Sequence, residues 1–561
     1  MLNLQTHLPI LPIIIPFMAT ALMLLFRDKD RIFKLAIACL SFTLLIVVAY
    51  VLLGFADGRL DGPWPNGVGV YLLGDWPAPF GIVVVVDRLS AIMLLLTAIL
   101  GAATWVYGTA RWDRAGVHFH SLFQLLIMGL NGAFLTGDLF NLFVFFEVLL
   151  AASYGLMLHG SGRSRVNASL HYIAVNLIAS FLLLIALAMI YGTTGTLNMA
   201  HLAIKAGVLA GPDRLLFESA AAILGIAFLI KAAAWPLNYW LIDGYANSAP
   251  PVAGMFSIMT KVGIYALVRI GSLLEPTGAP AAFGGAWMFP AGIATLIFGA
   301  VGMLAAHQTQ RMASYCIVLS SGTLLAALGM PGVILTGSAL YYMLSSVFAL
   351  GAFFMLLEMI SRVQSFGADF LAASQEAFDL DDDDQEVHDS EEVGLAIPGP
   401  IVFLGMGFIA CALLIIGLPP LSGFVAKFSL LSAALHASSA THATFNAWLF
   451  TACVLLSGFL GIVAFSRTGI RLFWSFDALN VPRLRLIEAL PVLSLIFACV
   501  VLSVRAGPIT SYLEDTARYL DQPGAYINAV LQKNADRSVN QTAVPKVEDV
   551  APTTRNSGAQ P

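Results

Sequence analysis

The sequence predicts an all-α polytopic membrane protein of about 14 transmembrane helices, with two inverted five-helix repeats that each contain a discontinuous helix. Of its 561 residues, 59% are hydrophobic and only 11% are charged. The apolar residues fall in runs of about 18–25, which is the length that spans a bilayer as a helix. Two runs are interrupted by proline beside a buried lysine. Paired interruptions in corresponding positions indicate inverted repeats.

The expected spans follow one another through mostly short loops. They lie near residues 9–26, 32–55, 81–108, 119–137, 139–159, 169–192, 219–241, 250–272, 285–306, 310–330, 333–362, 400–436, 446–467 and 487–506. We assign residues 1–118 to three N-terminal helices, 119–272 to the first repeat and 285–467 to the second. Residues 487–506 form helix 14, and residues 507–561 are expected to form a surface helix and a disordered tail.

The orientation follows from the basic residues in the short loops, because such loops remain in the cytoplasm. They cluster in the first, third and fifth loops and in the loop before the last span: Arg27, Lys29, Arg31, Lys34, Arg111, Arg114, Arg163, Arg165, Arg467, Arg471, Arg483 and Arg485. Both termini are then periplasmic, and the expected location is the bacterial inner (plasma) membrane. The N-terminus lacks a basic segment, so we interpret it as a retained helix and not a signal peptide.

An acidic insertion at 363–399 is placed in the cytoplasm by this topology. Its acidic residues are concentrated between Glu376 and Glu392, with no lysine or arginine between Arg362 and Lys427. One interpretation is a solvated, disordered loop. The alternatives are a contact with a partner or a mouth that attracts cations.

Lys231 lies at the end of an apolar helical run and is followed by Pro236. A lysine inside an apolar membrane helix costs roughly 2.5–3.5 kcal/mol. Proline has no N–H and clashes with the carbonyl one turn back, so the helix should break just after the lysine. In lipid, such a break is tolerated only where protein or a water-filled cavity satisfies the backbone. The pattern indicates a polar path through the membrane.

Glu147 lies in the middle of the span LFNLFVFFEVLLAASYG. A carboxylate at this depth is costly unless it is paired or protonated. Lys231 is its most plausible partner, either as a structural ion pair or as a pair that opens and closes during proton transfer. Lys261 in the eighth span and Lys427, just past Pro419 and Pro420 in the twelfth, lie at comparable depth. The four residues suggest a row of titratable sites across the bilayer plane.

Other ionisable residues are weaker candidates. His171 and His307 could relay protons, although a single histidine near a span is more often simply hydrogen-bonded. Arg269 and Glu488 lie near span ends and are expected to extend toward the interface, and Glu358 with Arg362 predicts a helix-end ion pair. The five cysteines are far apart, and no metal, cofactor or nucleophile motif is present. We therefore expect no metal and no cofactor, no nucleic-acid binding, and no enzyme activity.

Two long segments carry a resemblance to a known family. They are TGDLFNLFVFFEVLLAASYGLMLHG (136–160) and IKAAAWPLNYWLIDGYANSAPPVAGMFSIMTKVGIYALVR (230–269). The chain resembles the antiporter-like subunits shared by respiratory complex I and the Mrp-type (Mnh/Pha) Na+/H+ antiporters. Within that group it looks most like the D-type member of the Mrp antiporters. Residues 76–94, 126–141, 191–203 and 417–428 support this narrower resemblance.

The resemblance implies a fold of fourteen helices and a proton path through Glu147, Lys231, Lys261 and Lys427. It also implies a proton-conducting subunit of a multisubunit monovalent cation/H+ antiporter, with other membrane subunits as partners and H+ and Na+ (or K+ or Li+) as transported ions. The alternative is a proton-pumping subunit of a complex I-like quinone oxidoreductase or a membrane-bound hydrogenase. A structural scaffold without a transport role would have to explain four buried charges by packing alone.

Overall fold

The structure is a computed structural model, and it describes residues 4–25, 31–61, 64–274, 287–331, 333–378, 399–441, 444–473 and 484–531. Most of the predicted acidic insertion (residues 379–398) lies outside the described residues. So do residues 532–561, which contain the predicted disordered tail.

Long helices make up most of the described chain. They are α2 (Leu11–Leu25), α3 (Arg31–Ala56), α4 (Arg88–Thr109), α5 (Phe119–Leu135), α6 (Leu139–Met157), α7 (Arg163–Thr194), α9 (Gly211–Lys231), α12 (Met259–Leu274), α13 (Met288–Ala305), α14 (Thr309–Leu328), α15 (Thr336–Phe378), α16 (Gly399–Ile416), α17 (Ser422–Thr441), α18 (Thr444–Phe473), α19 (Leu486–Val504) and α20 (Ala506–Asp521). The shorter elements are α1 (Leu4–His7), η1 (Leu8–Ile10), η2 (Pro65–Gly67), β1 (Gly69–Leu72), η3 (Leu73–Asp75), β2 (Val83–Val86), η4 (Trp112–Arg114), α8 (Met199–Val208), α10 (Tyr239–Asn247) and α11 (Pro250–Phe256).

The described chain contains 12 helices that are long and apolar enough to cross a membrane. The two remaining expected spans correspond to α5, which has only 17 residues, and to the interrupted pair α9 and α10. Large apolar side chains face outward along the bundle, among them Tyr50, Phe181, Phe459 and Phe497, each more than half exposed. This surface suits contact with lipid, and the chain is a multi-pass membrane protein.

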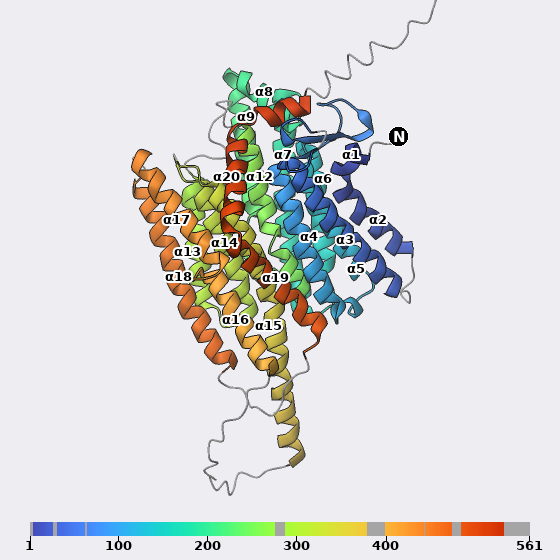
Figure 1. The fold of residues 1–561 in the computed structure, drawn as a ribbon, viewed down its shortest axis with the longest axis vertical. Helices are drawn as coiled ribbons and strands as arrows, with labels where there is room; N and C mark the ends of the chain where they lie inside the picture. Colours follow the sequence, from blue (N-terminus) through green and yellow to red (C-terminus); the bar gives the residue numbers. More distant parts are fainter. Residues whose placement is uncertain are drawn as a thin grey trace, which may run out of the picture.

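The helices run side by side along the long axis of the molecule (Figure 1). The first described residues and α8 lie at one end of the bundle, which we call the hairpin end because it also carries β1 and β2. The C-terminal part of α15 extends beyond the opposite end (Figure 1). Both ends of the described chain lie at the hairpin end, as an even number of crossings requires.

The third expected span begins later than the apolar run suggested. Residues Val83–Val86 form strand β2, which pairs antiparallel with β1 and is fully buried. Four consecutive β-branched residues favour a strand over the first turn of a helix. Asp87 then caps α4 in a capping box with Ser90, so the helix starts at Arg88 and not at residue 81.

Two charged residues expected to extend toward the interface are instead buried in ion pairs. Arg269 on α12 contacts Asp87 at 2.6 Å and is only 4% exposed. Glu488 on α19 contacts Arg362 on α15 at 2.9 Å. A buried charge without its partner is strongly destabilising, so these pairs join helices that the sequence alone does not show to be neighbours.

The amphipathic segment after the last span forms α20. Its apolar residues Leu513 and Leu520 are buried, and the helix packs against α15 and α12. The hydroxyl of Tyr512 also donates to the backbone carbonyl of Arg88 at 3.2 Å. The segment therefore closes the side of the bundle near the hairpin end.

Candidate functional site

The helix that carries Lys231 ends at that residue, and α10 begins only at Tyr239. Pro236 lies in the intervening segment and cannot continue the hydrogen-bond ladder of a helix. The N–H of Trp235, which the break frees, donates to the hydroxyl of Thr295 on α13 at 2.9 Å. The predicted break after Lys231 is confirmed, and a residue of the second half of the chain satisfies part of its backbone.

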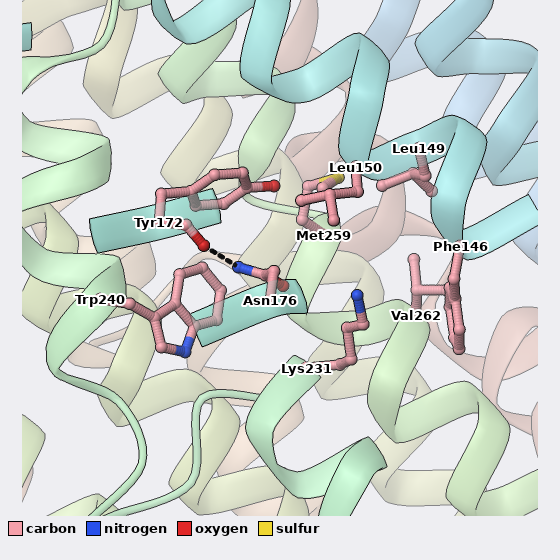
Figure 2. A pocket seen from close by; sticks show the side chains of 9 residues that line it. All are labelled: Phe146, Leu149, Leu150, Tyr172, Asn176, Lys231, Trp240, Met259 and Val262. Atoms are coloured by element: carbon pink, nitrogen blue, oxygen red, sulfur yellow. Dashed lines mark hydrogen bonds between the residues drawn. The ribbon is translucent and has the colours of Figure 1, made fainter. Parts of the chain in front are cut away.

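The amine of Lys231 borders a small cavity between α6, α7, α9, α10 and α12. The cavity has a volume of about 20 Å³ and is lined mainly by apolar side chains such as Phe146 and Val262. Figure 2 shows the amine pointing into it, with Asn176 on α7 nearby. The amide of Asn176 donates to the backbone carbonyl of Tyr172 at 2.9 Å. One water needs roughly 10–15 Å³, so the cavity can accommodate a single water next to the amine.

Glu147 lies on α6 and is half-buried. Phe146 is the residue immediately before Glu147, and the centre of its ring lies 5.4 Å from the amine of Lys231. Among the described residues, the buried Oε1 atom of Glu147 has no hydrogen-bond partner. The carboxylate is close enough for its charge to act on the amine of Lys231. The structure therefore brings the two charges into one neighbourhood without a direct ion pair between the described side chains.

Lys261 lies on α12 and is completely buried. Its amine donates to the hydroxyl of Thr260 at 3.1 Å and to that of Ser321 on α14 at 3.5 Å. The next residue, Val262, lines the cavity beside Lys231. Lys261 thus lies between the cavity beside Lys231 and helix α14. Its polar contacts among the described residues are these two hydroxyl groups.

The twelfth expected span is also interrupted, between Ile416 and Ser422. Gly417 ends α16 with a φ of +82°, a conformation that glycine adopts without steric cost. Lys427 on α17 is 7% exposed, and its amine donates to the carbonyl of Ile416 at 2.7 Å. The lysine therefore satisfies a carbonyl that the break frees, as buried backbone in a membrane requires. The second predicted discontinuity is confirmed.

Helix α14 connects the surroundings of Lys261 and Lys427. Ser321 contacts Lys261, and Cys316, on the same helix, lies near Lys427. Further hydroxyl groups occupy this part of α14 and the adjoining part of α15: Ser320, Thr323, Tyr342 and Ser346. Two of them, the hydroxyls of Ser320 and Ser346, are hydrogen-bonded to each other at 3.1 Å.

The sequence analysis missed this group of hydroxyl-bearing residues. The adjacent serine pairs 320–321 and 345–346 inside apolar spans were the available signal.

The remaining candidates lie away from the lysines. His171 is exposed, and its ring nitrogen contacts the carbonyl of Asn167 at 2.9 Å; His307 is also exposed. The predicted helix-end pair of Glu358 and Arg362 is confirmed at 3.6 Å. Within the described ranges, no cluster of three or more histidine, cysteine, aspartate or glutamate residues could hold a metal ion.

The four ionisable residues and the hydroxyl groups near them are chemically able to transfer protons. Four ionisable side chains lie inside an apolar bundle, on α6, α9, α12 and α17, and two of them flank helix interruptions. An ionisable group at this depth usually marks a path for ions or protons. Amines and hydroxyls can each donate and pass on a proton, whereas the surrounding aliphatic side chains cannot.

Comparison with known proteins identifies the family of the chain. A family model described as "NADH:quinone oxidoreductase/Mrp antiporter, TM" matches residues 136–455. The D subunit of a probable K(+)/H(+) antiporter from Rhizobium meliloti is 50% identical over 94% of this chain and 97% of its own length. The D subunit of an Na(+)/H(+) antiporter from Alkalihalophilus pseudofirmus is 31% identical over 94% of this chain and all of its own. A chain in the structure of the Mrp complex from Dietzia has a TM-score of 0.77 at 26% identity, covering 94% of this chain and 100% of that one. The chain therefore belongs to the transmembrane NADH:quinone oxidoreductase/Mrp antiporter family, and its relatives there include D subunits of multisubunit antiporters.

Proposed function

We propose that this chain is the proton-conducting subunit of a multisubunit monovalent cation/H+ antiporter. The observation that carries the proposal is the set of four ionisable residues, Glu147, Lys231, Lys261 and Lys427, inside the membrane bundle. The names of the relatives support the antiporter class, which makes the chain part of a transporter and not an enzyme. Other membrane subunits are its expected partners.

Proton transfer begins, in this proposal, between Glu147 and Lys231. When Glu147 takes up a proton, it loses the negative charge that stabilises the ammonium of Lys231. Lys231 then releases its proton toward Lys261, through the cavity beside its amine. Each step changes a charge in a low-dielectric surrounding, where the effect on the neighbouring group is large.

The path continues from Lys261 to Lys427 through the hydroxyl-bearing faces of α14 and α15. Lys427 holds the carbonyl of Ile416 at 2.7 Å. A neutral Lys427 still has N–H groups but loses its charge-assisted bond, which is about twice as strong as a neutral one. The protonation of Lys427 is thus linked to the geometry of the second helix break. In this proposal, cation movement in the complex changes the geometry of the break and thereby the protonation of Lys427.

The cation is proposed to be Na+ or K+. The sequence resemblance favours Na+, whereas the relative at 50% identity is named for K+. We further propose that α5 to α12 and α13 to α18 are inverted repeats. We also propose that the hairpin end faces the periplasmic side of the bacterial inner membrane, because the basic residues of the short loops favour the cytoplasm for the opposite end.

The second candidate function is a proton pump driven by a redox reaction, because the matching family also includes subunits of NADH:quinone oxidoreductase. The charged residues would keep the same roles, and only the partner subunits and the energy source would differ. The partners therefore distinguish the two functions.

The test is purification of the tagged chain from its own membranes in mild detergent, with mass spectrometry of the accompanying proteins. We expect several small hydrophobic subunits and no flavin or iron–sulfur protein. The same complex in proteoliposomes should dissipate an imposed pH gradient on addition of Na+ or K+. Co-purifying redox subunits, together with no response to either cation, would contradict the antiporter function.

A further inference from the structure

A large groove, separate from the four ionisable residues, opens on the side of the bundle near the hairpin end. Its volume is about 490 Å³, within the range of roughly 300–1,000 Å³ that is usual for small-molecule sites. Residues of α3, α4, α15, α19 and α20 line it. The lysines of the proposed proton path do not contribute to its walls.

The walls of the groove are almost entirely aliphatic or aromatic. Leu96 on α4 and Phe348 on α15 form buried parts of the wall, at 1% and 5% exposure. Phe497 on α19 is 66% exposed at its outer edge. These residues belong to helices that are long and apolar enough to cross a membrane, so the groove lies on a surface suited to contact with lipid. In a bilayer, the molecules that surround such helices are lipids, so a lipid acyl chain is available to fill the groove.

The charged residues that line the groove are both arginines, Arg59 and Arg505. Arg59 follows α3, and Arg505 stands between α19 and α20, so both lie where the membrane helices end. Arg59 contacts Asp57 at 2.5 Å. Within the described residues, the guanidinium of Arg505 has neither an ion pair nor a side-chain hydrogen bond. An apolar groove ending in two guanidinium groups is complementary to a molecule with an apolar tail and an anionic head.

We propose that this groove binds an anionic phospholipid, with an acyl chain along α4 and α15 and its phosphate between Arg505 and Arg59. Arginine matches phosphate geometry through two parallel N–H donors. The tail gains contact with a fixed apolar wall, and Ile509, Tyr512 and Leu513 of α20 also line the groove. The lipid thereby ties α20 to the membrane helices α4 and α19.

The test is native mass spectrometry of the complete complex after incubation with phosphatidylglycerol, phosphatidylcholine or inorganic phosphate. We expect retention of phosphatidylglycerol by the wild type. The double variant Arg59→Gln, Arg505→Gln should retain roughly tenfold less, since each lost charge-assisted bond weakens binding substantially. Ala498→Phe, which fills the groove from α19, should reduce retention of phospholipid whatever its headgroup.

The matched control is Arg518→Gln. Arg518 lies on α20, which contributes to the groove, but its side chain is 74% exposed, contacts Asp515 at 3.1 Å and does not line the groove. Its substitution should leave lipid retention unchanged. Equal retention by the double arginine variant and the wild type would overturn the proposal. So would displacement of the lipid by inorganic phosphate alone, or a cross-link from Ala498→Cys to an apolar helix of another subunit, which would identify a protein as the occupant.

Discussion

Replacing Lys261 by methionine is expected to abolish cation-dependent proton exchange while the complex still assembles. Lys261 is completely buried, and its amine contacts the hydroxyls of Thr260 and Ser321. Methionine has a similar length and fills irregular apolar space well, so packing is kept and the titratable group is lost. We expect the exchange rate to fall at least about tenfold, a barrier increase of ~1.4 kcal/mol or more. The measurement is the collapse of a pH gradient in vesicles that contain the complex.

The matched control is Ser321→Ala, which removes one hydrogen-bond acceptor and leaves the lysine in place. It should retain a substantial part of the exchange rate. Co-purification of the other subunits with both variants separates loss of transport from loss of assembly. Exchange at the wild-type rate in Lys261→Met would exclude this lysine from the proton path.

Replacing Lys427 by methionine is expected to have an effect of the same size, with an additional loss of stability. The variant loses the charge, and it also leaves the carbonyl of Ile416 without the donor that lies 2.7 Å away. A buried polar group without a partner costs about 1–3 kcal/mol. We therefore expect exchange to fall at least about tenfold and the complex to lose its subunits at a lower temperature than Lys261→Met does.

Phe428→Leu is the control for this position. Phe428 is the next residue on α17 and is 61% exposed, so it shares the helix but not the contact with Ile416. Its variant should exchange and assemble as the wild type does. If Lys427→Met lost stability but exchanged normally, the lysine would be a cap for the helix break and not a proton carrier.

The helix breaks were predictable because their causes are local. Pro236 follows Lys231 closely, and Gly417 precedes Pro419 and Pro420, so each interruption is encoded within a few residues. Most spans were predictable for a similar reason, since apolar run length reflects bilayer thickness directly, and 12 described helices are long and apolar enough to cross a membrane. Strand β2 was missed because four valines satisfy the apolar pattern of a helix and of a strand equally well.

The contacts between distant residues were not predictable from one sequence. Nothing local to Arg269 indicates that Asp87, the residue that caps α4, would hold it inside the bundle at 2.6 Å. The hydroxyls of Ser320 and Ser346 were overlooked because serine is common in apolar spans and matters only when helices bring several together. The relation of Glu147 to Lys231 was expected as a contact, whereas the structure has the two charges near each other without one.

The most direct test of the proposed proton path is the exchange rate of complexes carrying Glu147→Gln, Lys231→Ala and both together. It is measured as pH-gradient collapse on addition of Na+ or K+ in everted vesicles from cells without other antiporters. If the two residues act on one proton step, each single variant should lose most of the exchange, and the double variant should be no worse than either single one. Wild-type exchange in both single variants would contradict the account, because Glu147 and Lys231, the proposed first step of the path, would then have no role in moving protons.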